Sequence, residues 1–210
     1  QYGLRARALN ADDADACLLI SACRLALGEI AGALEAADAA KKIDPTNAKP
    51  FLTVGAIELS RGNLDEAERS FRRAMDLSPN LADARIGLAK VFRARGENEL
   101  AFQHLRAVTI EDPANAKAMI ELAELYVAND APKAAIAMYR ELATKQPKFY
   151  AARARLAELL IMGGNHNEAY NIAADLLAEH AGDVPAHLIL AFLFLRKNFY
   201  SLAEEHCLKA

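Results

Sequence analysis

Prolines recur at a fixed spacing along this chain of 210 residues. Pro45, Pro79, Pro113 and Pro147 lie 34 residues apart, and they are four of the seven prolines in the sequence. Proline lacks a backbone N–H and its ring clashes with the preceding turn, so it stops a helix. A helix stop at a constant spacing predicts that the chain repeats one structural unit.

Three further columns share this 34-residue spacing. The first contains residues that enter the left-handed backbone region at low cost, which is typical of a turn between helices. Its members are Gly28, Gly62, Gly96, Asp130, Gly164 and Asn198. The second is a column of alanines: Ala33, Ala67, Ala101, Ala135, Ala169 and Ala203. The third is aliphatic, and each member precedes a small residue: Ile20, Val54, Leu88, Leu122, Leu156 and Leu190.

One unit shows how these columns combine. The pattern predicts a first helix from Lys49 to Arg61 and a second from Leu64 to Leu77, with the turn at Gly62 and the stop at Pro79. Apolar residues three and four apart define one face of the second helix. They are Leu64, Ala67, Phe71 and Ala74. Alternation with a period of two is absent, so the predicted fold class is all-α.

Paired helices with this period resemble the tetratricopeptide repeat family. Val54 and Gly55 are similar to its leucine–glycine pair, and Phe71 to the aromatic of its second helix. The family's later aromatic of the first helix is replaced by Arg24 and Glu58 in the first two units. The resemblance implies an α-α superhelix, a right-handed solenoid of antiparallel helix pairs.

The repeat register covers nearly the whole chain as one continuous solenoid domain. The predicted units are 14–47, 48–81, 82–115, 116–149 and 150–183, with a partial repeat at 184–210 and the end of a preceding repeat at 1–13. In that first segment, Ala6 and Leu9 fit the end of a second helix. A solenoid normally ends in a polar capping helix, and none is evident here. We therefore expect a fragment of a longer array, with self-association through uncapped ends as one possibility.

The resemblance implies that the first helix of each unit lines a concave face. Two aliphatic columns, seven residues apart, share one face of those helices. The predicted partner-binding groove is lined by Leu18, Leu52, Leu59, Ile86, Lys90, Arg93, Ile120, Glu124, Val127, Glu158, Ile161, Leu188 and Phe192. Two interpretations stay open: neighbouring repeats bury these aliphatics, or they form an apolar trough for a peptide or helix of a partner. The chain's own further segments could also fill such a trough.

Two known subtypes of the family do not fit. Chaperone-binding repeats clamp a C-terminal carboxylate with lysine, arginine and asparagine, and Leu18, Thr53 and Asp83 stand at three of those places. Repeats resembling the O-linked N-acetylglucosamine transferase superhelix carry a ladder of asparagines. That row here reads Leu19, Thr53, Gly87, Glu121, Arg155 and Ile189.

Charge and composition exclude several classes of function. Lys and Arg total 25 against 28 Asp and Glu, a formal net charge of −3, which gives no basic face for nucleic acid. No apolar run reaches the ~18 residues that span a bilayer. Three cysteines without a paired motif argue against a disulfide framework. These features favour the cytoplasm over other compartments, and the periplasm remains open for a fragment.

Residues with catalytic or metal-binding chemistry are scattered. His180 and His187 flank one loop and could approach each other, but no third ligand accompanies them. The stretch GGNHNEAY at 163–170 has no lysine or preceding strand and is interpreted as an inter-helix turn rather than a phosphate loop. Cys17 and Cys207 fall on core columns. We therefore predict no enzyme activity, cofactor or metal.

The predicted function is that of a protein–protein interaction scaffold, whose partner is a partly apolar protein or peptide segment. An alternative is that these repeats form one arm of a larger enzyme, or of a bacterial secretion or polysaccharide-export apparatus.

Overall fold

The computed structural model describes residues 13–210, so the predicted helix end at Ala6 and Leu9 lies outside the described residues. The described chain contains twelve α-helices and no strand, which confirms the all-α prediction. It divides into an N-terminal unit that reaches to Glu111 and a C-terminal unit from Asp112 to Ala210.

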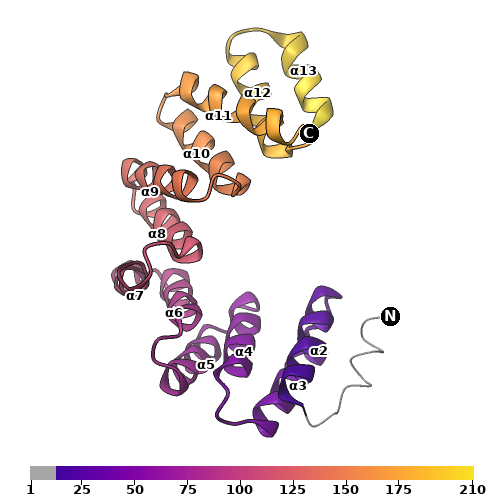
Figure 1. Cartoon of the computed structure of the whole chain (residues 1–210), viewed down its shortest axis with the longest axis vertical. Coiled ribbons are helices and arrows are strands. Elements are labelled where there is room, and N and C mark those ends of the chain that lie inside the picture. Colours follow the sequence, from indigo (N-terminus) through magenta and orange to yellow (C-terminus); the bar gives the residue numbers. More distant parts are fainter. Residues whose placement is uncertain (1–12) are drawn as a thin grey trace. The chain divides into compact units, whose positions relative to one another are not determined.

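Helices follow one another in pairs within each unit (Figure 1). The N-terminal unit contains α2 (Ala14–Ala26), α3 (Ile30–Ile43), α4 (Ala48–Ser60), α5 (Leu64–Leu77), α6 (Ala82–Ala94) and α7 (Asn98–Glu111). The C-terminal unit contains α8 (Ala116–Ala128), α9 (Pro132–Lys145), α10 (Tyr150–Met162), α11 (His166–Glu179), α12 (Val184–Arg196) and α13 (Tyr200–Lys209). The helices predicted for one repeat, Lys49 to Arg61 and Leu64 to Leu77, correspond to α4 and α5 with a shift of one residue at each end of the first.

The turn inside every helix pair has one residue in the left-handed region, as predicted. Its φ values are 78° at Gly28 and Gly62, 80° at Gly96 and 82° at Gly164. The two members that are not glycine are Asp130 at 56° and Asn198 at 61°. Because each φ is positive, the chain reverses direction within a few residues. This geometry also confirms that GGNHNEAY contains an inter-helix turn.

Small residues let the two helices of a pair approach closely. All six members of the alanine column are buried, with exposed fractions of 0% from Ala33 to Ala169 and 2% at Ala203. The aliphatic column is also internal: Val54, Leu88, Leu122, Leu156 and Leu190 are exposed by 5% or less. Ile20 is the half-buried member. Burial of these side chains away from water supplies the main driving force for pairing.

Phe71 of α5 lies between two glycines on neighbouring helices. A Cβ atom added to Gly55 of α4 would lie 2.8 Å from the Phe71 ring, and one added to Gly87 of α6 would lie closer still. The ring itself is only 4% exposed. The absence of side chains at both glycines therefore gives α5 space to pack against α4 and α6 together.

Polar side chains fill the two positions where the first helix lacks its aromatic residue. The Arg24 guanidinium donates from Nη1 to the carbonyl oxygen of Gly32 at 2.9 Å. Glu58 is buried, and it accepts hydrogen bonds from Arg61 at 2.9 Å and Asn63 at 2.6 Å. These bonds satisfy groups that would otherwise be costly to bury. They replace an apolar contact with local polar contacts across the turn.

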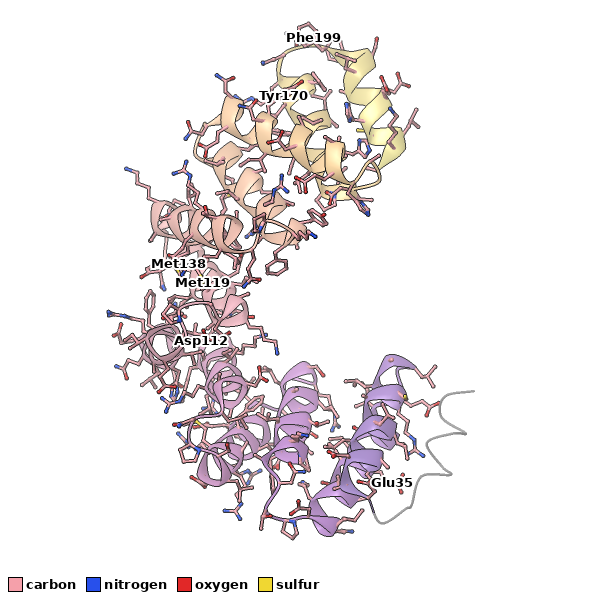
Figure 2. The ribbon with its side chains drawn as sticks, in the orientation of Figure 1. Glu35, Asp112, Met119, Met138, Tyr170 and Phe199 are labelled. Carbon is pink, nitrogen blue, oxygen red and sulfur yellow. The ribbon has the colours of Figure 1, made fainter. Side chains whose placement is uncertain are left out.

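The C-terminal unit has a core to which all six of its helices except α13 contribute buried residues. Met119 of α8 is buried in this core, and the partly buried Met138 of α9 packs against it; both are labelled in Figure 2. At the end of α12, Phe194 packs edge-on against Tyr170 at 6.1 Å and Phe199 at 6.5 Å between ring centroids (Figure 2). These rings connect α11, α12 and the start of α13.

A pair of histidines joins α13 to α12. His187 is 4% exposed, its Nε2 lies 3.0 Å from the carbonyl oxygen of Ala181, and its Nδ1 lies 2.8 Å from Nδ1 of His206. A carbonyl oxygen only accepts, so Nε2 of His187 carries the proton and Nδ1 accepts from His206. Burial is the main cause that lowers the pKa of His206 below the usual 6.5, and the neighbouring ring of His187 lowers it further whenever that ring is protonated. The charged groups near the pair include Glu205 and Lys209 of α13.

The packing of Phe71 predicts that Gly87→Ala destabilises the fold. Alanine in a helix interior normally gains up to ~1 kcal/mol over glycine, whereas overpacking a core costs about 1–3 kcal/mol. Urea unfolding should therefore show a lower free energy of unfolding for Gly87→Ala. Phe71→Leu should lower the free energy of unfolding less in the Gly87→Ala variant than in the parent chain, because the smaller side chain makes room for the new methyl group. A gain in stability for Gly87→Ala alone would contradict this packing.

The histidine pair predicts that stability falls as the pH drops through about 6.5. His206 has a lower pKa in the folded chain, so the unfolded chain binds more protons between the two pKa values and unfolding becomes easier there. His104 contributes in the same direction, because burial and then Arg85 and Arg72 lower its pKa. Between pH 8 and 5, urea unfolding should show a smaller loss of stability for His206→Asn than for the parent chain. Asparagine keeps a donor for His187 but does not titrate. An equal loss in the parent and in this variant would contradict the assignment.

Candidate functional site

The predicted groove residues of the N-terminal unit are mostly half-buried. Leu18, Leu52 and Leu59 fall in this class, as do Lys90 and Arg93. Leu18 packs against a small cluster in the first helix pair.

Ile86 differs from its neighbours in the same column. Only 5% of its surface is exposed. A substitution there would change the core as well as any groove, so other positions are needed to test binding.

The predicted residues of the C-terminal unit become more exposed toward its last helix pair. Ile120, Val127 and Ile161 are half-buried and pack against the core of this unit. On α12, Leu188 is 52% exposed and Phe192 is 41% exposed. The most exposed part of the predicted surface therefore lies on α12.

A pocket of 470 Å³ lies between α10 and α12. It is lined by Arg155, Glu158, Ile161, Met162, Pro185, Leu188, Ile189 and Phe192. Four of these were predicted from the sequence: Glu158, Ile161, Leu188 and Phe192. The other four were missed, although Met162 and Pro185 extend the same helix faces and could have been found from their spacing.

Arg155 organises the polar side of this pocket. Its guanidinium donates to both carboxylate oxygens of Glu124, from Nε at 2.8 Å and from Nη2 at 2.9 Å. Nη1 donates to Glu158 at 2.8 Å. A fork-to-fork pair of this kind fixes the orientation of both side chains. In the sequence, Arg155 stood out only as a departure from an asparagine ladder, and nothing there paired it with Glu124.

The same network sets the charge state of its members. The hydrogen bonding of Arg155 to the Glu124 carboxylate, which accepts, is the main reason that the pKa of Arg155 is raised, so the arginine stays charged. Tyr139 donates from its hydroxyl to Glu124 at 2.7 Å. Burial first, and this hydrogen bond second, raise the pKa of Tyr139 above its usual 10.0. The network therefore combines a charged arginine and a neutral tyrosine with the carboxyl groups of Glu124 and Glu158.

Three arginines of the N-terminal unit, Arg72, Arg73 and Arg95, contact other side chains of that unit. Arg95 donates to Asp65 at 2.6 Å and also bonds Glu68, while Arg72 lies 2.5 Å from Glu68. The guanidinium of Arg73 lies 5.9 Å from the centre of the Phe51 ring. Each of these three arginines therefore has a partner within the chain.

The candidate histidines and cysteines have different local environments in the structure. His180 lies against Tyr150, with 6.1 Å between ring centroids, whereas His187 pairs with His206. Residues 13–210 contain no group of three or more possible metal ligands. Cys17 is buried as predicted, but Cys207 is exposed. The exposure of Cys207 corrects the prediction of a core position for it.

None of the helices described in residues 13–210 combines the length and apolar character needed to cross a membrane.

Comparisons with known proteins identify the fold. Two family models described as tetratricopeptide repeat match residues 55–116 and 127–193. By sequence, no curated protein matches the chain.

Solved structures give the same result. The structure of pilF from Pseudomonas aeruginosa shares 16% identity, with 100% of this chain and 92% of that chain covered and a TM-score of 0.76. PilW, a type IV pilus biogenesis factor, shares 17%, with 92% and 90% covered and a TM-score of 0.75. A thermophilic repeat protein from Thermus thermophilus shares 19%, with 87% and 99% covered and a TM-score of 0.71. At these identities the likeness concerns the fold.

The 34-residue register, the left-handed turn in every helix pair and the two matching family models all agree. The chain belongs to the tetratricopeptide repeat family.

Proposed function

We propose that this chain is a protein-interaction scaffold, and that a peptide or helix of a partner binds in an apolar groove on the first helices of the repeats. The observation that carries this proposal is the uncovered apolar face of α12. Leu188, Phe192 and Leu195 are exposed by 41–52% and border or extend the pocket beside α10. Clustered exposed apolar side chains of this kind typically mark interaction sites.

The proposed mechanism is binding without chemistry. Aliphatic and aromatic side chains supply most of the affinity when they leave water. Glu124, Arg155 and Glu158 present fixed charges beside them, which favours partner selection over affinity. Within the N-terminal unit, half-buried residues such as Leu52 and Leu59 would supply apolar contacts on that unit's own first helices.

A second possibility is that these repeats serve as one arm of a larger assembly. It is favoured by the fold likeness to PilW, a pilus biogenesis factor. The sequence on both sides of residues 1 and 210 in the parent gene would test it. A catalytic domain or a secretion-apparatus domain there would support this assignment.

Site-specific photo-crosslinking tests the groove proposal. A photoreactive phenylalanine at Phe192 of α12 should capture a discrete partner in cells of the organism that encodes the chain. The matched control is the same residue at Tyr200 of α13, which is 64% exposed and outside the pocket. Leu188→Asp should remove the product formed from position 192, because a buried charge at the interface is costly.

Leu188 is 52% exposed, so this change should leave the helical circular dichroism signal intact. A product that forms equally from both positions, or that survives Leu188→Asp in a folded chain, would contradict the groove.

A further inference from the structure

We infer that the pocket between α10 and α12 takes an amphipathic helix, with apolar anchors about one turn apart and a basic residue on the flank that faces α10. The inference rests on the proposed function and specifies the chemistry of the partner. It follows from the shape, polarity and charge of the described pocket.

Helix α12 is apolar around most of its circumference. One face carries Ala186, Ile189, Leu190 and Leu193, each exposed by 5% or less. The opposite face carries Pro185, Leu188, Phe192 and Leu195 at intervals of three and four residues. A helix that is apolar on all sides is normally buried on all sides. The second face is therefore suited to a covering element.

The second face, formed by Pro185, Leu188, Phe192 and Leu195, is long enough to contact several turns of a partner helix. Residues 185–195 span about three helical turns, or roughly 15 Å. The adjacent wall is α10, which contacts α12 directly and contributes Ile161 and Met162. Met162 is 72% exposed, and its flexible thioether chain can adapt to anchors of different shapes.

The lining favours a helix over an extended peptide. Among the described lining residues, the only charged side chains are Arg155 and Glu158, which are already bonded to each other, and the others are apolar. An extended peptide would leave backbone N–H and C=O groups without partners against this surface, at a cost in free energy. A helix satisfies those groups internally and presents only side chains.

Charge determines which flank of the partner helix faces α10. Glu124 binds Arg155 through two hydrogen bonds, whereas Glu158 has one bond to Arg155 and a side chain that is 44% exposed. The α10 rim therefore presents an accessible carboxylate. On the α12 side, the guanidinium of Arg196 lies 5.9 Å from the centre of the Phe192 ring. A basic partner residue is attracted to the α10 rim and repelled from the α12 rim, which sets its orientation.

Three synthetic peptides test this inference by fluorescence anisotropy with the full chain. Each is a helix of about sixteen residues with leucines at i, i+4, i+7 and i+11. One carries lysines along one flank of the leucine stripe, one carries glutamates there, and one carries the lysines but serines in place of the leucines. We expect the lysine peptide to bind about five-fold more tightly than the glutamate peptide, the scale of one partly exposed ion pair. The serine peptide should not bind.

Variants locate the effect on the pocket. Glu158→Gln should abolish the preference for the lysine peptide. The control Glu168→Gln on α11 should preserve it, because it removes a carboxylate that pairs with Arg140 of α9. Leu188→Ser should weaken both leucine peptides, whereas Leu202→Ser on α13 should not, although Leu202 is 42% exposed.

The outcomes separate this inference from the proposed function. The inference is overturned if the glutamate peptide binds as tightly as the lysine peptide or more tightly. It is also overturned if Leu188→Ser leaves the binding of the leucine peptides unchanged. Failure of both leucine peptides together with a specific crosslink from position 192 also overturns it, while the groove itself stands. Failure of the peptides and of the crosslink overturns both.

Discussion

Every helix pair of this chain depends on a reversal of direction that a residue with positive φ makes possible. Glycine adopts that conformation without steric cost, while Asp130 and Asn198 adopt it with some strain. The reversal places the alanine column of the second helix against the first helix, where a larger side chain would push the two apart. The turn and the small-residue contact therefore act together, and the residues that form them recur every 34 positions in the sequence.

Local constraints of this kind explain why the fold could be predicted from the sequence. The turn column and the buried alanines each act within a single repeat, so their spacing alone identifies them. Contacts between more distant residues could not be predicted in the same way. The bond between His187 and His206 joins two helices across 19 residues, and neither histidine belongs to a column of the repeat. Glu58 was recognised as a departure, but its bonds to Arg61 and Asn63 required the structure.

The candidate site was predictable only in part, because exposure depends on what packs above each residue. Ile86 and Leu188 occupy the same position of their repeats, yet one is 5% exposed and the other 52%. Periodicity assigns both to one helix face and cannot distinguish them. Arg155 was missed for a related reason: its partner Glu124 lies 31 residues away on another helix, and a column-by-column comparison does not pair different columns.

These differences concentrate the accessible apolar surface of the C-terminal unit at its last helix pairs. A repeat fold normally distributes similar surfaces along its length, so a partner can bind in several registers. The Arg155 network breaks that equivalence, because it combines a bidentate ion pair, a buried tyrosine and an exposed carboxylate beside the pocket between α10 and α12. In the proposed groove, apolar contacts could bind many helices, and a fixed charge at one rim would discriminate among them. Under this proposal, specificity would arise where the sequence departs from its own repeat.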